Sequence, residues 1–181
     1  MKRTILASMI TAMLMLTIPN CLLSQTKPAA PPRYKDVVVD NPNAESDLKT
    51  VGDYINALVA ADYVKAKSFL SDNYMGHGPS PKDSSNRDQT IAGWQENAKT
   101  QLNPKTSFVS QTFRVTQGNE KGDWISVWGD YSFTQNGTEV KFPYQYTAHI
   151  TNGKIDRSGV YYDRLYIMET LGFKVVPPPG Q

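Results

Sequence analysis

The sequence has a single cysteine, Cys21, and only two histidines, His77 and His149, in 181 residues. One thiol cannot form an internal disulfide, and this residue set does not supply the ligands of a usual zinc site. The net charge is also small, at +2, so no large basic field exists to attract nucleic acid. The chain further lacks a glycine-rich phosphate loop and a serine in a nucleophile-elbow motif. We therefore expect no metal, no cofactor and no nucleic-acid partner.

What is present fits a folded globular chain, with 39% hydrophobic and 10% aromatic residues. The N-terminus differs, because the basic start Met1-Lys2-Arg3 precedes an uncharged apolar run from Thr4 to Pro19. This order is typical of a secretory signal peptide, which we place at residues 1–24. The run is short for a membrane span and no second candidate follows, so we expect no transmembrane span after signal removal. Removing this segment takes the net charge to zero, so the positive excess belongs to the signal.

The expected localisation is therefore exported, either periplasmic or extracellular. Cys21 offers an alternative, because exported lipoproteins carry a cysteine just after the apolar region. Such proteins usually have a small residue immediately before that cysteine, whereas here Pro19 and Asn20 precede it. Cleavage after Ser24 is the preferred interpretation, and a lipid anchor through Cys21 is the alternative.

Proline content divides the rest of the chain. Residues 25–43 contain four prolines and no amphipathic period, which predicts an extended linker. Its apolar segment Val37-Val38-Val39 either adds a short edge strand or packs on the domain. Residues 175–181 form a second irregular, proline-rich tail, so the folded domain is expected over residues 44–174.

The first half of this domain has helical periodicity. Apolar residues recur on one face between Glu45 and Ala60, and Asp62 is placed to cap a second, short helix. A third helix is expected over Arg87–Gln101. Between the second and third helices, the segment from Tyr74 to Pro79 is rich in glycine, which indicates a short strand or turn.

After Pro104 the sequence becomes rich in β-branched and aromatic residues. Asn136-Gly137 and Asn152-Gly153 separate runs of this kind and are strong signals for hairpin turns. The expected strands are Ser107–Thr116, Trp124–Thr134, Val140–Thr151 and Ile155–Tyr162. Helices followed by a meander predict an α+β fold, with three N-terminal helices packed on a curved antiparallel sheet.

The order of these elements resembles the nuclear transport factor 2-like superfamily. The closing segments Asn152-Gly153-Lys154-Ile155, Tyr161-Tyr162-Asp163 and Thr170-Leu171-Gly172 resemble its SnoaL-like branch, although Asn152 replaces an aspartate and Thr170 a glutamine of that pattern. The resemblance implies a cone-shaped roll with a pocket at one end, and commonly a homodimer formed through the sheet. Its members include isomerases, hydratases and polyketide cyclases, so the fold alone assigns no reaction.

The resemblance also implies a role for Asp163, which matches an acid/base aspartate of SnoaL-like cyclases. Burial in an apolar pocket would make such a carboxylate a usable base. The alternatives are that Asp163 lines the pocket without catalysis, or that it caps the terminal turn at Arg164 or pairs with Arg157 or Arg164. A dyad with His149 is not favoured, because neither register of the Asn152-Gly153 hairpin brings the two side chains together. His149 is instead expected to be a satisfied or surface histidine.

Other candidates would line the pocket. His77 lies where the mouth of the cone is expected, and Tyr161 or His77 could donate a hydrogen bond to a developing oxyanion. The expected lining residues are His77, Trp94, Trp128, Tyr144, Tyr146 and Tyr161. The alternatives are a turn histidine with a local hydrogen bond for His77, and packing in the core or at a dimer interface for the aromatic residues.

Three functions remain open. The first is an exported domain whose pocket binds a small, largely apolar molecule, with no reaction proven. The second is a cofactor-free isomerase, hydratase or cyclase that uses Asp163. The third is a dimeric, envelope-associated interaction module, favoured by apolar residues on both faces of the strand with Trp124 and Trp128.

Overall fold

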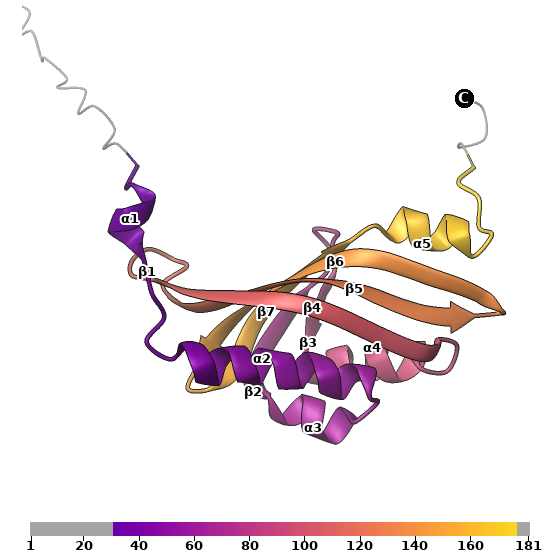
Figure 1. Cartoon of the computed structure of the whole chain (residues 1–181), viewed down its shortest axis with the longest axis horizontal. Helices are drawn as coiled ribbons and strands as arrows, with labels where there is room; N and C mark the ends of the chain where they lie inside the picture. The colour runs from indigo at the N-terminus through magenta and orange to yellow at the C-terminus, as the bar shows by residue number, and fades with distance from the viewer. Residues whose placement is uncertain (1–30, 177–181) are drawn as a thin grey trace, which may run out of the picture. The chain divides into compact units, whose positions relative to one another are not determined.

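The computed structural model describes residues 31–176 (Figure 1). The elements follow in the order α1 (Tyr34–Val37), β1 (Val38–Val39), α2 (Ala44–Val59), α3 (Tyr63–Ser68), β2 (Leu70–His77), β3 (Ser84–Asn86), α4 (Arg87–Asn97), β4 (Leu102–Val115), β5 (Gly122–Gln135), β6 (Thr138–Thr151), β7 (Lys154–Tyr162) and α5 (Arg164–Thr170). The signal peptide, its cleavage site and Cys21 lie outside the described residues and stay predictions. Within residues 31–176, no helix is long and apolar enough to cross a membrane.

The helices begin where the sequence supplies caps. The Asp62 side chain accepts a hydrogen bond from the Lys65 amide at the start of α3. At the start of α4, Asn86 and Gln89 form a reciprocal capping box. The three expected helices are thus confirmed as α2, α3 and α4.

The sheet has seven strands in the order β1-β4-β5-β6-β7-β2-β3. Strands β4 to β7 form the expected antiparallel meander, with tight turns at Asn136-Gly137 and Asn152-Gly153 in which all four residues have positive φ. The sheet as a whole is mixed, because β2 pairs parallel to β7 beside the antiparallel meander. The long connection from β2 through α4 and the meander to β7 permits this parallel pairing, which a hairpin would not.

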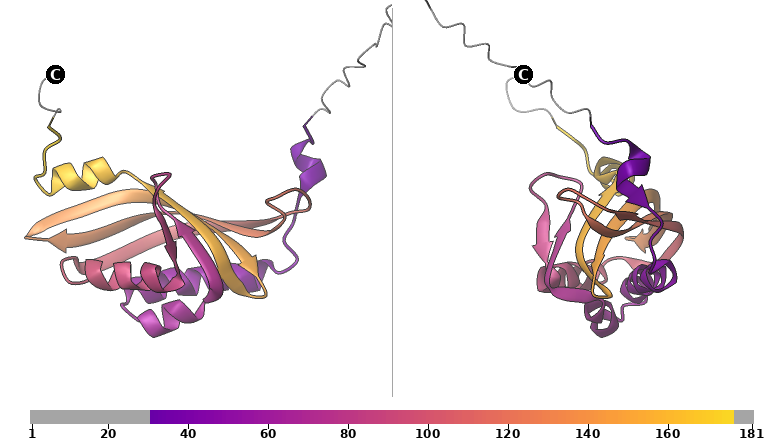
Figure 2. Two further views of the ribbon diagram at one scale, coloured as in Figure 1. Left: turned by 180° about the vertical axis from the view of Figure 1, so that it is seen from behind. Right: turned by 90° about the vertical axis from the view of Figure 1, so that its left-hand side faces the viewer.

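The core lies between α2 and the concave face of the sheet. Val51, Tyr54 and Leu58 of α2 pack with Val127 and Ala148 of the central strands, all of them buried. Figures 1 and 2 show α2, α3 and α4 on one side of the curved sheet, with α5 lying apart from them. Ile167 and Leu171, in and just after α5, pack against a second cluster of Phe133, Val140 and Phe142.

The segment before α2 contributes to the domain as well as linking to it. Val38 and Val39 pair with Val115 and Arg114 of β4, which confirms the edge-strand alternative. Asn41 is buried and donates hydrogen bonds to Asp47 and to Thr112, each at 2.8 Å.

Candidate functional site

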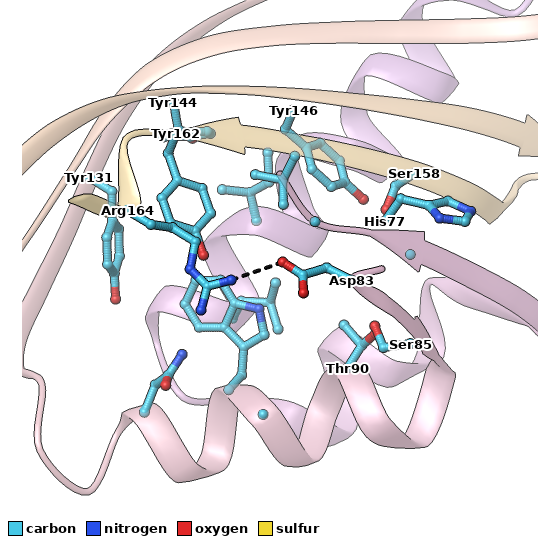
Figure 3. A pocket seen from close by; sticks show the side chains of 18 of the residues that line it. His77, Asp83, Ser85, Thr90, Tyr131, Tyr144, Tyr146, Ser158, Tyr162 and Arg164 are labelled. Atoms are coloured by element: carbon cyan, nitrogen blue, oxygen red, sulfur yellow. Dashed lines mark hydrogen bonds and ion pairs between the residues drawn. The ribbon is translucent and has the colours of Figure 1, made fainter. Parts of the chain in front are cut away.

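A cavity of about 590 Å³ opens between the sheet, α4, α5 and the β2–β3 hairpin (Figure 3). Its volume is in the range of ligand pockets, which commonly measure about 300–1,000 Å³. The lining comes from segments far apart in the sequence, so the fold creates the cavity and no local motif marks it.

The sheet supplies an aromatic wall made of Tyr131, Phe133, Phe142, Tyr144 and Tyr162. Four of these rings contact one another, with centroids 5.9 Å apart for Tyr131 and Phe133, 5.8 Å for Tyr131 and Phe142, and 5.5 Å for Phe142 and Tyr162. Trp94 of α4 meets Tyr131 edge to face at 5.9 Å. Because neighbouring rings are tilted or edge to face, an apolar ring compound would contact both ring faces and ring edges here.

The inner part of the cavity carries hydroxyl groups. The hydroxyls of Tyr74 and Ser158 lie 2.7 Å apart, and both residues are buried. The Tyr146 hydroxyl is also buried and has no hydrogen-bond partner among the described residues. Burial raises the pKa of the Tyr74 phenol, and burial followed by Tyr74 raises that of Tyr146 well above its ordinary value. These phenols therefore stay protonated at neutral pH and act as hydrogen-bond donors, not as bases.

The α4 wall is more polar than the sheet wall. Gln89, Gly93 and Asn97 follow one another at one-turn intervals and all line the cavity. The Thr90 hydroxyl lies 2.7 Å from the Ser85 hydroxyl, and the Gln101 side chain accepts a hydrogen bond from Tyr131 at 3.2 Å.

Charged groups border the cavity near α5. An Arg164 guanidinium nitrogen lies 2.9 Å from an Asp83 carboxylate oxygen, joining α5 to the β2–β3 loop (Figure 3). Both side chains are more than one-third exposed. Among the lining residues in the described part of the chain, Asp83 is the one carboxylate.

The structure brings four of the expected lining residues together: His77, Trp94, Tyr144 and Tyr146. It does not place Trp128 and Tyr161 in the cavity. Both face outward, with 41% and 60% of their surface exposed. The physical reason is strand alternation, which turns Tyr162 inward and Tyr161 outward.

Asp163 does not line the cavity either. It is exposed, and its carboxylate accepts a hydrogen bond from the Tyr166 amide at 2.9 Å as the N-cap of α5. This is the capping alternative named above. The acid/base role implied by the resemblance has no geometric support at this position.

Several lining residues were not identified from the sequence. Tyr74, Asp83 and Arg164 come together only because β2 and β3 fold beside β7. Tyr131 shares its strand face with Ile125 and Val127, and this apolar pattern is the signal in the sequence that marks the face as the inner one.

His149 is a satisfied structural histidine, as expected. Its Nδ1 lies 2.6 Å from Asp156, and its Nε2 lies 3.2 Å from the Lys121 carbonyl oxygen. Its ring packs on Trp124 at 4.9 Å. No dyad with Asp163 forms. Within residues 31–176, no cluster of His, Cys, Asp and Glu is arranged to hold a metal ion.

No family model matches this chain, and no curated protein sequence matches it. Solved structures do match. A candidate polyketide cyclase of Xanthomonas campestris has a TM-score of 0.60 at 13% identity, covering 72% of this chain and 99% of that one. A ketosteroid isomerase-like protein of Catenulispora acidiphila, solved with trimethylamine, has a TM-score of 0.58 at 12% identity, covering 71% and 98%.

A nuclear transport factor 2-like protein of Burkholderia xenovorans has a TM-score of 0.54 at 11% identity, covering 70% of this chain and 96% of that one. The chain therefore has the nuclear transport factor 2-like fold, and the fold expected from the sequence is confirmed. At these identities the likeness defines the architecture and leaves the chemistry open.

Proposed function

We propose that the domain binds a small, largely apolar molecule in its cavity. The observation that carries this proposal is the pairing of a continuous aromatic wall with buried hydroxyl donors in a space of about 590 Å³. Side chains that served only as core would fill such a space, because protein interiors are close-packed. The Tyr146 hydroxyl, which lacks a partner among the described residues, suits a ligand with a hydrogen-bond acceptor.

The test places the same substitution on the two faces of the sheet. Val160 lines the cavity, whereas Val109 lies on the outer face and is 69% exposed. We expect the naphthalene ketone dye Prodan to bind the wild type, with a blue-shifted emission. Val160→Phe should weaken binding by about tenfold or more, since added volume in a pocket acts at this scale. Val109→Phe should not change it. Equal binding by all three proteins would refute the proposal.

A second candidate function is cofactor-free acid/base catalysis, favoured by the phenol donors and by a likeness to a candidate polyketide cyclase. Tyr74 and Tyr146 would stabilise a developing oxyanion. Asp163 is badly placed as a base, so His77 or Asp83 at the cavity would have to take that role. Loss of turnover in Asp83→Asn or His77→Gln, with Asp163→Asn still active, would support this assignment.

We also propose that the protein is exported and forms a homodimer through the outer face of the sheet. Val109, Trp128, Gln145 and Tyr161 are register partners across four adjacent strands. Three of them are exposed large apolar residues, which a partner would cover. Light scattering should give a dimer mass that Trp128→Arg reduces to that of a monomer. A wild-type monomer at all concentrations would contradict the dimer, and cell fractionation tests export.

A further inference from the structure

The α4 wall contains a glycine in the interior of a helix. Gly93 is the seventh residue of α4, which runs from Arg87 to Asn97. Glycine at such a position destabilises a helix relative to alanine, because the unfolded chain has more conformational freedom to lose. A reason for this residue therefore has to come from its surroundings.

Neither the backbone nor the packing requires a glycine there. Gly93 is not one of the glycines that have a positive φ in the described part of the chain. A Cβ atom placed on it would meet no heavy atom within 4 Å. Gly76 and Gly129 differ, because a Cβ on them would meet Tyr74 Oη at 2.5 Å and the Ser107 carbonyl oxygen at 2.3 Å.

Gly93 is exposed, and the surface that it exposes borders the cavity. Gly93 is one of the lining residues, flanked one turn away on each side by Gln89 and Asn97. The Gln89 side chain is occupied in the capping box of α4. The aromatic wall of the sheet forms the other boundary of the same cavity. A side chain at position 93 would thus reduce the width available between helix and sheet.

We propose that Gly93 is a specificity-determining residue, and that the ligand is a flat, uncharged ring compound lying against the α4 backbone at this position. The ring character follows from the aromatic side chains opposite, and flatness follows from the slot that the missing side chain at position 93 leaves between them and the α4 backbone. The absence of charge follows because the inner hydroxyls are neutral donors and the charges of Asp83 and Arg164 are paired with each other. This inference rests on the proposed ligand-binding function.

Gly52 provides a matched control for the experiment. It lies in the interior of α2, outside the cavity lining, and a Cβ there would make an ordinary contact with Phe108 at 3.9 Å. Gly93→Ala and Gly52→Ala should each raise Tm, by about 2–4 °C. Only Gly93→Ala should weaken Prodan binding, by about tenfold, and Gly93→Leu should abolish it. A gain in stability coupled to a loss of binding distinguishes a ligand-facing glycine from a merely tolerated one.

Displacement of Prodan by three small molecules tests the ligand class. The flat neutral ketone 2-acetylnaphthalene should compete at least about tenfold better than the anion 2-naphthoate. It should also compete better by a similar factor than the bulky 1-adamantyl methyl ketone. Equal competition by either of the other two compounds would overturn the assignment.

The outcomes separate the two proposals. If the wild type binds Prodan and Gly93→Ala binds it equally well, the role of Gly93 is refuted while the proposed function stands. If the wild type binds none of the probes, the proposed function fails, and the inference fails with it.

Discussion

At the scale of single residues, polar side chains far from the cavity hold the end of the sheet where α2 begins. The Asp123 carboxylate is buried and accepts two hydrogen bonds from Arg114, at 2.5 and 2.7 Å, and one from Asn43 at 3.2 Å. It thereby connects the segment before α2 to two central strands. The Arg114 hydrogen bonds, and then Asn43, hold the pKa of Asp123 below its ordinary value.

We predict that Asp123→Asn lowers the free energy of unfolding by about 2–3 kcal/mol at pH 7, since a buried charge-assisted pair is lost. Because the folded-state pKa of Asp123 is lowered, the extra stability of the wild type is fully present above the unfolded-state pKa of about 4. It is lost as pH falls through the folded-state pKa. Urea unfolding of both proteins at pH 7, 5, 4 and 3 measures the difference at each pH.

Asp130 serves as the control for this prediction. It pairs with Lys141 at 3.2 Å, but both side chains are well exposed. Asp130→Asn should change stability by no more than about 0.5 kcal/mol. A wild-type advantage over Asp123→Asn that does not depend on pH would contradict the assignment.

At the scale of elements, the sequence predicts best where one face is buried with a regular period. Helix α2 is predicted in this way, and strands β5 to β7 are predicted from their β-branched and aromatic content and the two hairpin turns, each within about two residues of its ends. Strand β4 begins at Leu102, earlier than expected, because its register shift between Leu102 and Lys105 accommodates Pro104. The parallel pairing of β2 with β7 could not be predicted, since it depends on tertiary contacts across the whole meander.

Helix α5 is the element on which the role of Asp163 is decided. Asparagine caps helices about as well as aspartate but carries no charge, whereas the alanine side chain cannot cap a helix. We predict that Asp163→Asn keeps the hydrogen-exchange protection of residues 164–170 and the affinity for Prodan. Asp163→Ala should lower the protection, in line with a loss of about 0.5–2 kcal/mol. If a reaction is found and Asp163→Asn abolishes it while α5 stays protected, the capping interpretation is insufficient.

At the scale of the whole molecule, the cavity is where prediction from sequence was weakest. The sequence indicated that the domain would contain a pocket and that Tyr144 and Tyr146 would line it. It could not show which face of the sheet is concave. In the structure, Trp128 and Tyr161 lie on the outer face and Tyr131 lies on the inner face. The side on which α2 packs settles the question, and this is a property of the assembled chain and not of any strand.

Buried and half-buried phenols gather around the cavity, which makes stability depend on alkaline pH. Burial raises the pKa of Tyr131 to about 12, and it also raises those of Tyr54, Tyr74, Tyr144 and Tyr146. A raised folded-state pKa gives stability that is fully present below the unfolded-state value of about 10 and is lost as pH rises through the folded-state pKa. We therefore predict that the protein unfolds progressively above about pH 10.

Spectrophotometric titration at 295 nm, run beside circular dichroism, tests this prediction. Phenolate formation in the folded protein should lag behind that in guanidinium, and its last part should coincide with loss of the sheet signal. Tyr131→Phe should remove part of this late absorbance change, because its phenol is one of those that ionise last. Superimposed titration curves for the folded and unfolded protein would show that these tyrosines are not shielded from water as the structure places them.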